Sequence, residues 1–335
     1  MLLVTGANGF IGSHVLALFS QVESQSHQQG QRVCALARSP IAGVSTHLAD
    51  LRDLASIRAA LDQAHPSAII HAGAMRDPAA CEKSRDESTL VNFHATRAIA
   101  RWCQEHGTRL IFLSTDLVFD GVSRAGAQTS MSPSIQAASV PSASESLPDV
   151  QSAGLLCESA PRRPINHYGV TKALAEDVVF ATPRATVARI ALTLGHSPVD
   201  QPARSPHEFV VNALRAGQPV KLFVNEYRTP IHVDDAAAAL VALLDHEVPC
   251  VHVGGPDRVS RMEMGIALAS AYNLNATLCT PGFHDAQSSG LFRPLDTAMN
   301  TTLLRTLLAD APGVPTPRSM AAMARDLAAS DQCRE

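Results

Sequence analysis

Short apolar runs alternate with longer amphipathic stretches through the first 190 residues of the chain. The apolar runs fall at residues 2–4, 32–37, 67–72, 109–114 and 186–191. Between them, apolar residues recur at the three- and four-residue spacing of a helix that buries one face. A strand that is apolar along its whole length is typical of a parallel sheet covered by helices on both sides. The pattern therefore predicts an α/β fold of the Rossmann type, with a doubly wound parallel sheet.

The pattern becomes less regular after residue 190, where helices are expected at 207–214 and 236–244. We therefore divide the chain into a Rossmann domain over 1–190 and a smaller C-terminal lobe over 191–335. Segments of this lobe can cross back to the sheet, because such lobes are built from insertions between elements of the sheet.

An insertion is expected within the first domain, at residues 122–160. Its stretch 125–153 is rich in Ser, Ala, Pro and Gln. This composition buries little apolar surface, so it predicts a flexible segment. A disordered loop is the simpler account of it, and a lid over the functional site is the alternative.

A glycine-rich turn directly follows the first apolar run and precedes a helical pattern. Gly6 allows the tight turn, Gly9 lets backbone amides approach a pyrophosphate, and Gly12 lets the helix pack close to the strand. The phosphates would then meet the positive end of the helix dipole. A tight turn without a ligand is the alternative. The dinucleotide contacts predicted in this turn are Gly6, Asn8, Gly9, Phe10, Ile11 and Gly12.

Further cofactor contacts are expected where the strands end, because parallel sheets bind ligands at their carboxyl edge. Arg38 ends the second strand, where a site selective for NAD usually carries an acidic residue. An arginine suits a 2′-phosphate, so NADP(H) is predicted over NAD(H), and a surface arginine stacked on adenine with either cofactor is the alternative. The residues predicted to contact the cofactor at these strand ends are Arg38, Asp50, Leu51, Ala72, Gly73, Ala74 and Ile190.

Tyr168 and Lys172 lie four residues apart, which places them on the same face of a helix. An ammonium beside a phenol favours the phenolate and lowers the pKa of the phenol. Such a phenol can give or take a proton in a reaction at a carbonyl. A solvated helix face would show the same spacing by chance.

Together with the glycine turn and the Tyr–Lys pair, the run Ser-Thr-Asp-Leu-Val-Phe-Asp-Gly at 114–121 resembles the extended short-chain dehydrogenases/reductases, and among them the dTDP-4-dehydrorhamnose reductase branch. The resemblance implies NADPH-dependent reduction of a nucleotide-activated keto sugar. It implies that Tyr168 is the proton donor, that Lys172 lowers the pKa of Tyr168 and binds the nicotinamide ribose, and that Thr115 bonds the substrate oxygen.

The resemblance also implies contacts away from the Tyr–Lys pair. Asn92 would lie near the cofactor and hold a water or a helix bend, with a helix-surface or capping role as the alternative. Arg228 would face the substrate diphosphate, with a structural salt bridge as an equal alternative. The residues expected to bind substrate are Met75, Arg76, Thr115, Asp116 and Arg228, and residues 191–335 would form the substrate-binding lobe.

Two other functions remain open. An epimerase or dehydratase keeps the same Tyr and Lys, but Leu117 stands where a dehydratase usually has a glutamate. A non-catalytic NADP-binding regulatory subunit, such as the partner of methionine adenosyltransferase, has the same fold but catalyses no reaction. The presence of Thr115, Tyr168 and Lys172 argues against it.

Bulk properties narrow the expected partners and location. The formal net charge of −4 argues against nucleic-acid and membrane-surface binding. We expect a cytoplasmic protein for three reasons. The seven cysteines form no C-x-x-C pair, no apolar run is long enough for a bilayer, and no signal peptide is recognised. No metal is expected, because the histidines show no ligand spacing.

A homodimer is expected through the helices at 93–106 and 168–180, as the resemblance implies. The apolar residues at suitable spacing are Ala98, Ile99, Trp102, Ala173, Leu174 and Val178. Core packing within one subunit would produce the same pattern.

Overall fold

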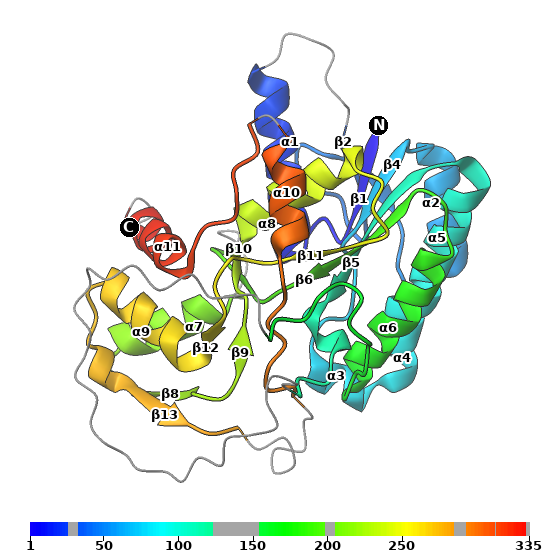
Figure 1. Cartoon of the computed structure of the whole chain (residues 1–335). Coiled ribbons are helices and arrows are strands. Elements are labelled where there is room, and N and C mark those ends of the chain that lie inside the picture. The colour runs from blue at the N-terminus through cyan, green and yellow to red at the C-terminus, as the bar shows by residue number, and fades with distance from the viewer. Residues whose placement is uncertain (26–32, 123–153, 198–204, 285–292, 312, 333–335) are drawn as a thin grey trace.

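The computed structural model describes residues 1–335 except 26–32, 123–153, 198–204, 285–292, 312 and 333–335 (Figure 1). Its centre is a seven-stranded parallel sheet in the order β3-β2-β1-β4-β5-β6-β11. This confirms the predicted doubly wound Rossmann sheet, with the switch in strand order between β1 and β4. The strands are β1 (Leu2–Thr5), β2 (Val33–Ala37), β3 (Ser45–Leu48), β4 (Ala68–His71), β5 (Arg109–Thr115), β6 (Ala185–Ile190) and β11 (Cys250–Val253).

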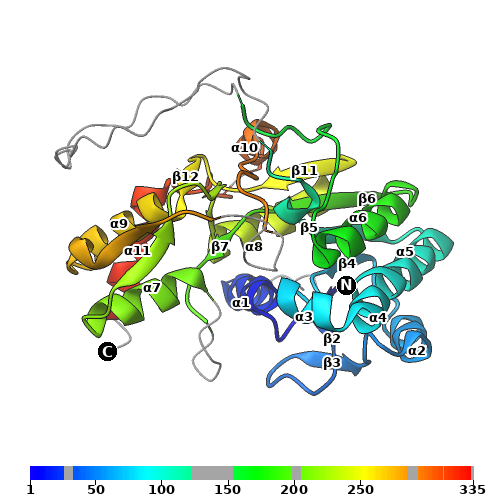
Figure 2. The same cartoon turned by 90° about the horizontal axis from the view of Figure 1, so that it is seen from below.

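Helices cover both faces of this sheet (Figure 2). One face carries α1 (Phe10–Gln25), α8 (Val233–Ala242) and α10 (Thr302–Ala309), and the other carries α2 (Leu54–Ala64), α5 (Ala95–His106) and α6 (His167–Phe180). The short elements around them are α3 (Pro78–Lys83), α4 (Arg85–Thr89), the π-helical turn η1 (Leu90–His94) and the 3₁₀ turns η2 (Asp116–Val118) and η3 (Leu243–Asp245).

Strand β5 shows why the strands are apolar throughout. Leu110 and Phe112 pack with α5 and α6, whereas Ile111 and Leu113 pack with α1 and α8. Both faces of the strand are buried, because successive side chains point to opposite sides of the sheet.

A second hydrophobic core lies outside the sheet. It is built by α7 (Pro206–Arg215), α9 (Arg261–Ala271), α11 (Met320–Gln332) and the strand pair β8 (Val220–Phe223) and β13 (Cys279–Gly282). The remaining elements are the pair β7 (Thr193–Leu194) and β10 (Ile231–His232), the pair β9 (Tyr227–Arg228) and β12 (Val259–Ser260), and η4 (Ala276–Leu278). Residues beyond 190 thus contribute to both parts, because β11, α8 and α10 belong to the sheet layers.

Residues 123–153 of the predicted insertion lie outside the described residues, but its last part, 154–160, is described. There the N–H of Leu156 donates to the carbonyl of Ala298 at 3.0 Å, and the N–H of Asn300 donates to the carbonyl of Leu156 at 2.8 Å. Arg189 donates to the carbonyl of Glu158 at 2.9 Å. These hydrogen bonds pair residues 156 and 158 with the rest of the fold.

None of the helices in the described part of the chain combines the length and apolar character that a bilayer crossing requires.

Candidate active site

A cavity of about 910 Å³ opens at the carboxyl edge of the sheet. Loops after β1, β2, β3, β4, β5 and β6 all reach it, because the carboxyl ends of parallel strands share one edge. Of the predicted site residues, only Asn92 and Arg228 are absent from its lining. The predicted residues that line it are Gly6, Asn8, Gly9, Phe10, Ile11, Gly12, Arg38, Asp50, Leu51, Ala72, Gly73, Ala74, Met75, Arg76, Thr115, Asp116, Tyr168, Lys172 and Ile190.

The glycine turn brings two backbone segments together. Gly6 has φ +63°, and a Cβ built on it would lie 2.6 Å from the amide nitrogen of Gly73, the loop residue after β4. A Cβ on Gly12 would collide with the carbonyl oxygen of Gly6, which fixes how close α1 comes to the turn. These contacts leave no room for a side chain, so they require glycine at both positions.

The loop after β3 adds charges that the sequence did not single out. Arg52 makes a two-pronged ion pair with Asp50, with Nη2 to Oδ2 at 2.6 Å and Nε to Oδ1 at 3.1 Å. Arg52 holds the pKa of Asp50 down at about 2, so this carboxylate stays ionised and paired. Arg52 and Glu87 also line the cavity, beside the exposed Arg38. The only sequence signal for Arg52 was its place two residues after Asp50.

Helix α6 carries Tyr168 and Lys172, and it begins where the Asn166 side chain accepts the N–H of Gly169 at 2.8 Å. Both side chains are buried, and Lys172 Nζ lies 4.0 Å from the centre of the Phe112 ring. Burial lowers the pKa of Lys172 to about 7, against the opposing charge of Glu176.

The expected lowering of the Tyr168 pKa is wrong in this structure. Burial raises the pKa of Tyr168, and the nearby carboxylate of Asp116 raises it further. The phenol is therefore held in its protonated form, because desolvation and a negative neighbour both oppose the phenolate.

Asp116 links the end of β5 to the C-terminal part of the chain. Its Oδ1 accepts from the Thr115 hydroxyl at 3.2 Å, and its Oδ2 accepts from the Thr297 hydroxyl at 2.6 Å. Arg228 Nε lies 3.2 Å from the same Oδ2. Arg228 also donates to the carbonyl of Pro294 at 2.9 Å.

The expected place of Arg228 in the cavity is therefore corrected. It lies behind Asp116 as a structural ion pair, the alternative that the sequence left open, because the buried carboxylate needs a counter-charge.

Asn92 is also placed behind the cavity wall. Its Oδ1 accepts from the N–H of Met75 at 2.8 Å, and its Nδ2 donates to Thr171 Oγ1 at 3.0 Å. It is fully buried in the π-helical turn, so the helix-surface and capping alternatives are both wrong. Asn92 instead ties the Met75 rim of the cavity to α6.

A chain of hydrogen bonds that the sequence did not predict runs beneath the site. The N–H of Gly73 donates to Thr5 Oγ1 at 3.1 Å, and the Thr5 hydroxyl donates to His71 Nδ1 at 2.6 Å, since the proton of this neutral ring lies on Nε2. His71 Nε2 then donates to Thr96 Oγ1 at 3.0 Å, because the Thr96 hydroxyl already donates to the carbonyl of Asn92 at 2.7 Å. Burial lowers the pKa of His71 to about 3, so the ring stays neutral.

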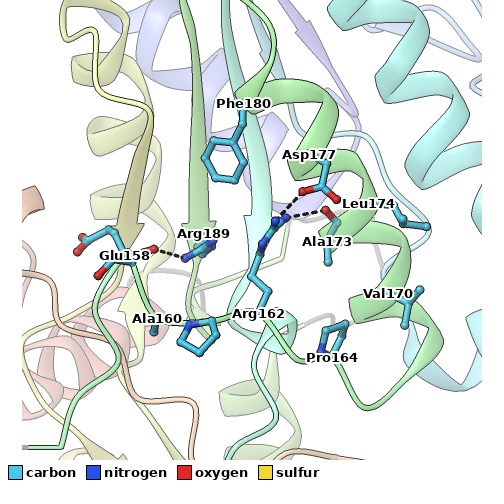
Figure 3. A pocket seen from close by; sticks show the side chains of 12 residues that line it. Glu158, Ala160, Arg162, Pro164, Val170, Ala173, Leu174, Asp177, Phe180 and Arg189 are labelled. Carbon is cyan, nitrogen blue, oxygen red and sulfur yellow. Dashed lines mark hydrogen bonds and ion pairs between the residues drawn. The ribbon is translucent and has the colours of Figure 1, made fainter.

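A second cavity, of about 520 Å³, lies on the outer side of α6 (Figure 3). Two of its lining residues pair with each other, since Arg162 donates to Asp177 at 2.5 Å. A third, Arg189, donates to the buried Glu176 behind the lining at 2.8 Å. Glu176 lies one helical turn after Lys172, so this cluster supports the helix face that carries the Tyr–Lys pair.

No cluster of three or more His, Cys, Asp or Glu side chains with the geometry for a metal ion occurs among the residues that the structure describes.

The chain is similar to known proteins in sequence and in fold. Residues 1–313 match the family model described as the RmlD substrate binding domain. The dTDP-4-keto-6-deoxy-D-glucose reductase of Streptomyces niveus is 28% identical over 249 residues, which cover 73% of this chain and 68% of that protein. The methionine adenosyltransferase 2 subunit beta of Rattus norvegicus is 26% identical over 313 residues, covering 91% of this chain and 81% of that protein.

Among solved structures, the dTDP-4-dehydrorhamnose reductase of Bacillus anthracis, in complex with NADP, has a similar fold. Its TM-score is 0.73, with 18% sequence identity and coverage of 98% of each chain.

The buried pair of Arg189 and Glu176 yields a stability prediction. Glu176→Gln leaves the Arg189 guanidinium buried without its counter-charge, and we expect a loss of about 3–5 kcal/mol in the free energy of unfolding. Urea unfolding followed by circular dichroism measures this loss.

Glu247→Gln is the matched control, since its ion pair with Arg184 at 3.3 Å is exposed on both sides. Removing an exposed pair should cost about 0–1 kcal/mol. Equal losses in the two variants would contradict the role given to Glu176.

Proposed function

The chain belongs to the family of the RmlD substrate binding domain, whose model matches residues 1–313. We propose that it is an NADPH-dependent reductase of a nucleotide-activated keto sugar. Family membership confirms the resemblance found in the sequence, and with it an oxidoreductase of the extended short-chain dehydrogenase/reductase type. The observation that carries the proposal is one cavity lined by Thr115, Tyr168, Lys172 and the glycine turn.

The proposed reaction needs one hydride and one proton at the same carbonyl group. When bound, a reduced nicotinamide supplies the hydride to the keto carbon. Tyr168 gives its proton to the carbonyl oxygen, and the protonated phenol described above is the form that a donor needs. The Lys172 ammonium stabilises the phenolate left behind, which regains a proton before the next turnover. The Thr115 hydroxyl, now bonded to Asp116, would turn to the substrate oxygen.

Two arginines support NADP(H) over NAD(H). Arg38 is exposed at the rim of the cavity just after β2, and Arg52 lines the same cavity. Asp50, the nearest carboxylate along the chain, is already paired with Arg52. A 2′-phosphate would therefore meet a basic rim through charge-assisted hydrogen bonds.

The sugar nucleotide would occupy the part of the cavity near Met75, Arg76 and Asp116. Arg76, which lines this part of the cavity, would meet its diphosphate. Arg228 would contribute through Asp116, whose carboxylate it fixes.

A regulatory subunit without turnover is the second candidate, because the rat methionine adenosyltransferase subunit aligns with 91% of this chain. An epimerase or dehydratase is less favoured, since Leu117 lines the cavity where a dehydratase would place a glutamate. A test of net cofactor oxidation separates all three.

We expect purified protein to oxidise NADPH stoichiometrically with a nucleotide-4-keto sugar, followed by absorbance of the reduced cofactor. Tyr168→Phe should lower kcat by about 10²–10⁴-fold while NADPH still binds, because only the proton donor is lost. Isomerised substrate without net oxidation would instead support an epimerase, and tight binding without turnover a regulatory subunit. Unchanged turnover in Tyr168→Phe would rule out its assigned role.

The cofactor preference is tested by Arg38→Ala. Loss of a charge-assisted hydrogen bond of about 1.5–3 kcal/mol should weaken NADPH binding by roughly 10–150-fold and leave NADH binding nearly unchanged. Isothermal titration calorimetry gives both dissociation constants. Arg101→Ala, a highly exposed arginine of α5, is the control. An equal effect on both cofactors would instead place Arg38 against the adenine.

We further propose a homodimer through α5 and α6. Leu174 and Phe180, both 42% exposed, give α6 an apolar outer surface. Ile99 and Trp102 do not serve this contact, because both are buried within the subunit. The α5 contribution would come from its outward residues, among them Ala98.

Leu174→Glu should raise the dimer dissociation constant about tenfold or more, because a charge would enter an apolar contact. Sedimentation velocity measures the change. Ile266→Glu, on α9, is the matched control, since Ile266 is also 42% exposed. A wild-type monomer, or a Leu174→Glu dimer of unchanged strength, would contradict this interface.

A further inference from the structure

Ser114, the residue before Thr115 on β5, has a hydroxyl with an unusual environment. The side chain is 2% exposed, and its Oγ has no hydrogen-bond partner among the residues that the structure describes. Leaving a buried hydroxyl unpaired costs about 1–3 kcal/mol, so folded proteins rarely keep one without a reason. Ser114 also lines the large cavity, unlike the other residues that carry such an atom in the described part of the chain.

The position of Ser114 in β5 shows on which face of the sheet its side chain lies. Side chains alternate along a strand, so Ser114 lies on the same face of β5 as Phe112. Its register partner on β6 is Arg189, whose guanidinium reaches Glu176 on α6. Lys172 of the same helix lies over the Phe112 ring. The Ser114 hydroxyl therefore faces the helix that carries Tyr168 and Lys172.

We propose that Ser114 is a further cofactor-binding residue, whose hydroxyl bonds a hydroxyl group of the ribose next to the nicotinamide. This rests on the proposed function, in which that ribose lies against Lys172. A ribose hydroxyl both donates and accepts, as a serine hydroxyl does, so the two can pair in either direction. Binding would thus satisfy the atom that the free protein leaves unpaired.

The proposal predicts that Ser114→Ala leaves the free protein as stable as wild type or more so, and that it weakens NADPH binding. Ser114→Ala removes an unpaired polar atom, so the free protein should unfold at the same temperature as wild type or higher. The same change should raise the NADPH dissociation constant about two- to twelvefold, the loss of one hydrogen bond. A serine that merely supported the fold would destabilise the free protein when replaced.

Ser88→Ala is the matched control. Ser88 is equally buried, but its Oγ donates to the carbonyl of Arg85 at 3.0 Å, and it does not line the cavity. This variant should lower the melting temperature of the free protein and leave NADPH binding unchanged.

Binding of 2′,5′-ADP, which lacks the second ribose, locates the effect. Calorimetry should show it bound equally by wild type and Ser114→Ala. If Ser114→Ala weakened the binding of NADPH and of 2′,5′-ADP equally, or left NADPH binding unchanged, the role of Ser114 would be overturned and the proposed function would stand. A wild-type protein that binds neither NADPH nor NADH would overturn the proposed function itself, and the Ser114 inference with it.

Discussion

The close approach of the backbone at Gly6 and Gly73 is the constraint on which the site depends. These residues follow β1 and β4, the two strands between which the strand order of the sheet reverses, and their contact leaves no room for a side chain. The hydrogen-bond chain through Thr5, His71 and Thr96 fixes the same place from below. These contacts hold the loops after β1 and β4 against each other at the floor of the cavity.

Two buried carboxylates then set the charges around the reacting groups. Asp116 lies beside Tyr168 and is paired with Arg228, while Glu176 follows Lys172 and is paired with Arg189. Burial and the first carboxylate together raise the pKa of the Tyr168 phenol, and the second carboxylate favours the charged form of the lysine against its burial. Each arginine comes from a different strand, so the protonation states of the site depend on the packing of β6 and β9 around it.

Local sequence was sufficient for the elements that carry the site. The apolar runs located five of the seven strands of the sheet to within a residue or two, because strands buried on both faces have no polar alternation. They did not locate β3 and β11. The glycine spacing located the turn, because no other residue tolerates those contacts. The spacing of Tyr168 and Lys172 placed them on one helical face. The sequence left the roles of Arg228 and Asn92 open between alternatives, because it shows the charge or amide of a side chain but not the groups among which that side chain is buried.

The sequence by itself indicated the fold class, the glycine turn and the candidate Tyr–Lys pair, since each leaves a pattern or spacing among residues near in the chain. Only the tertiary structure decided the direction of the Tyr168 pKa, the ion pair of Arg228 with Asp116 and the unpaired hydroxyl of Ser114. These depend on desolvation and on partners far away in the chain, such as Arg228 beside Asp116. Electrostatic effects of this kind arise from three-dimensional burial, which periodicity and spacing do not encode.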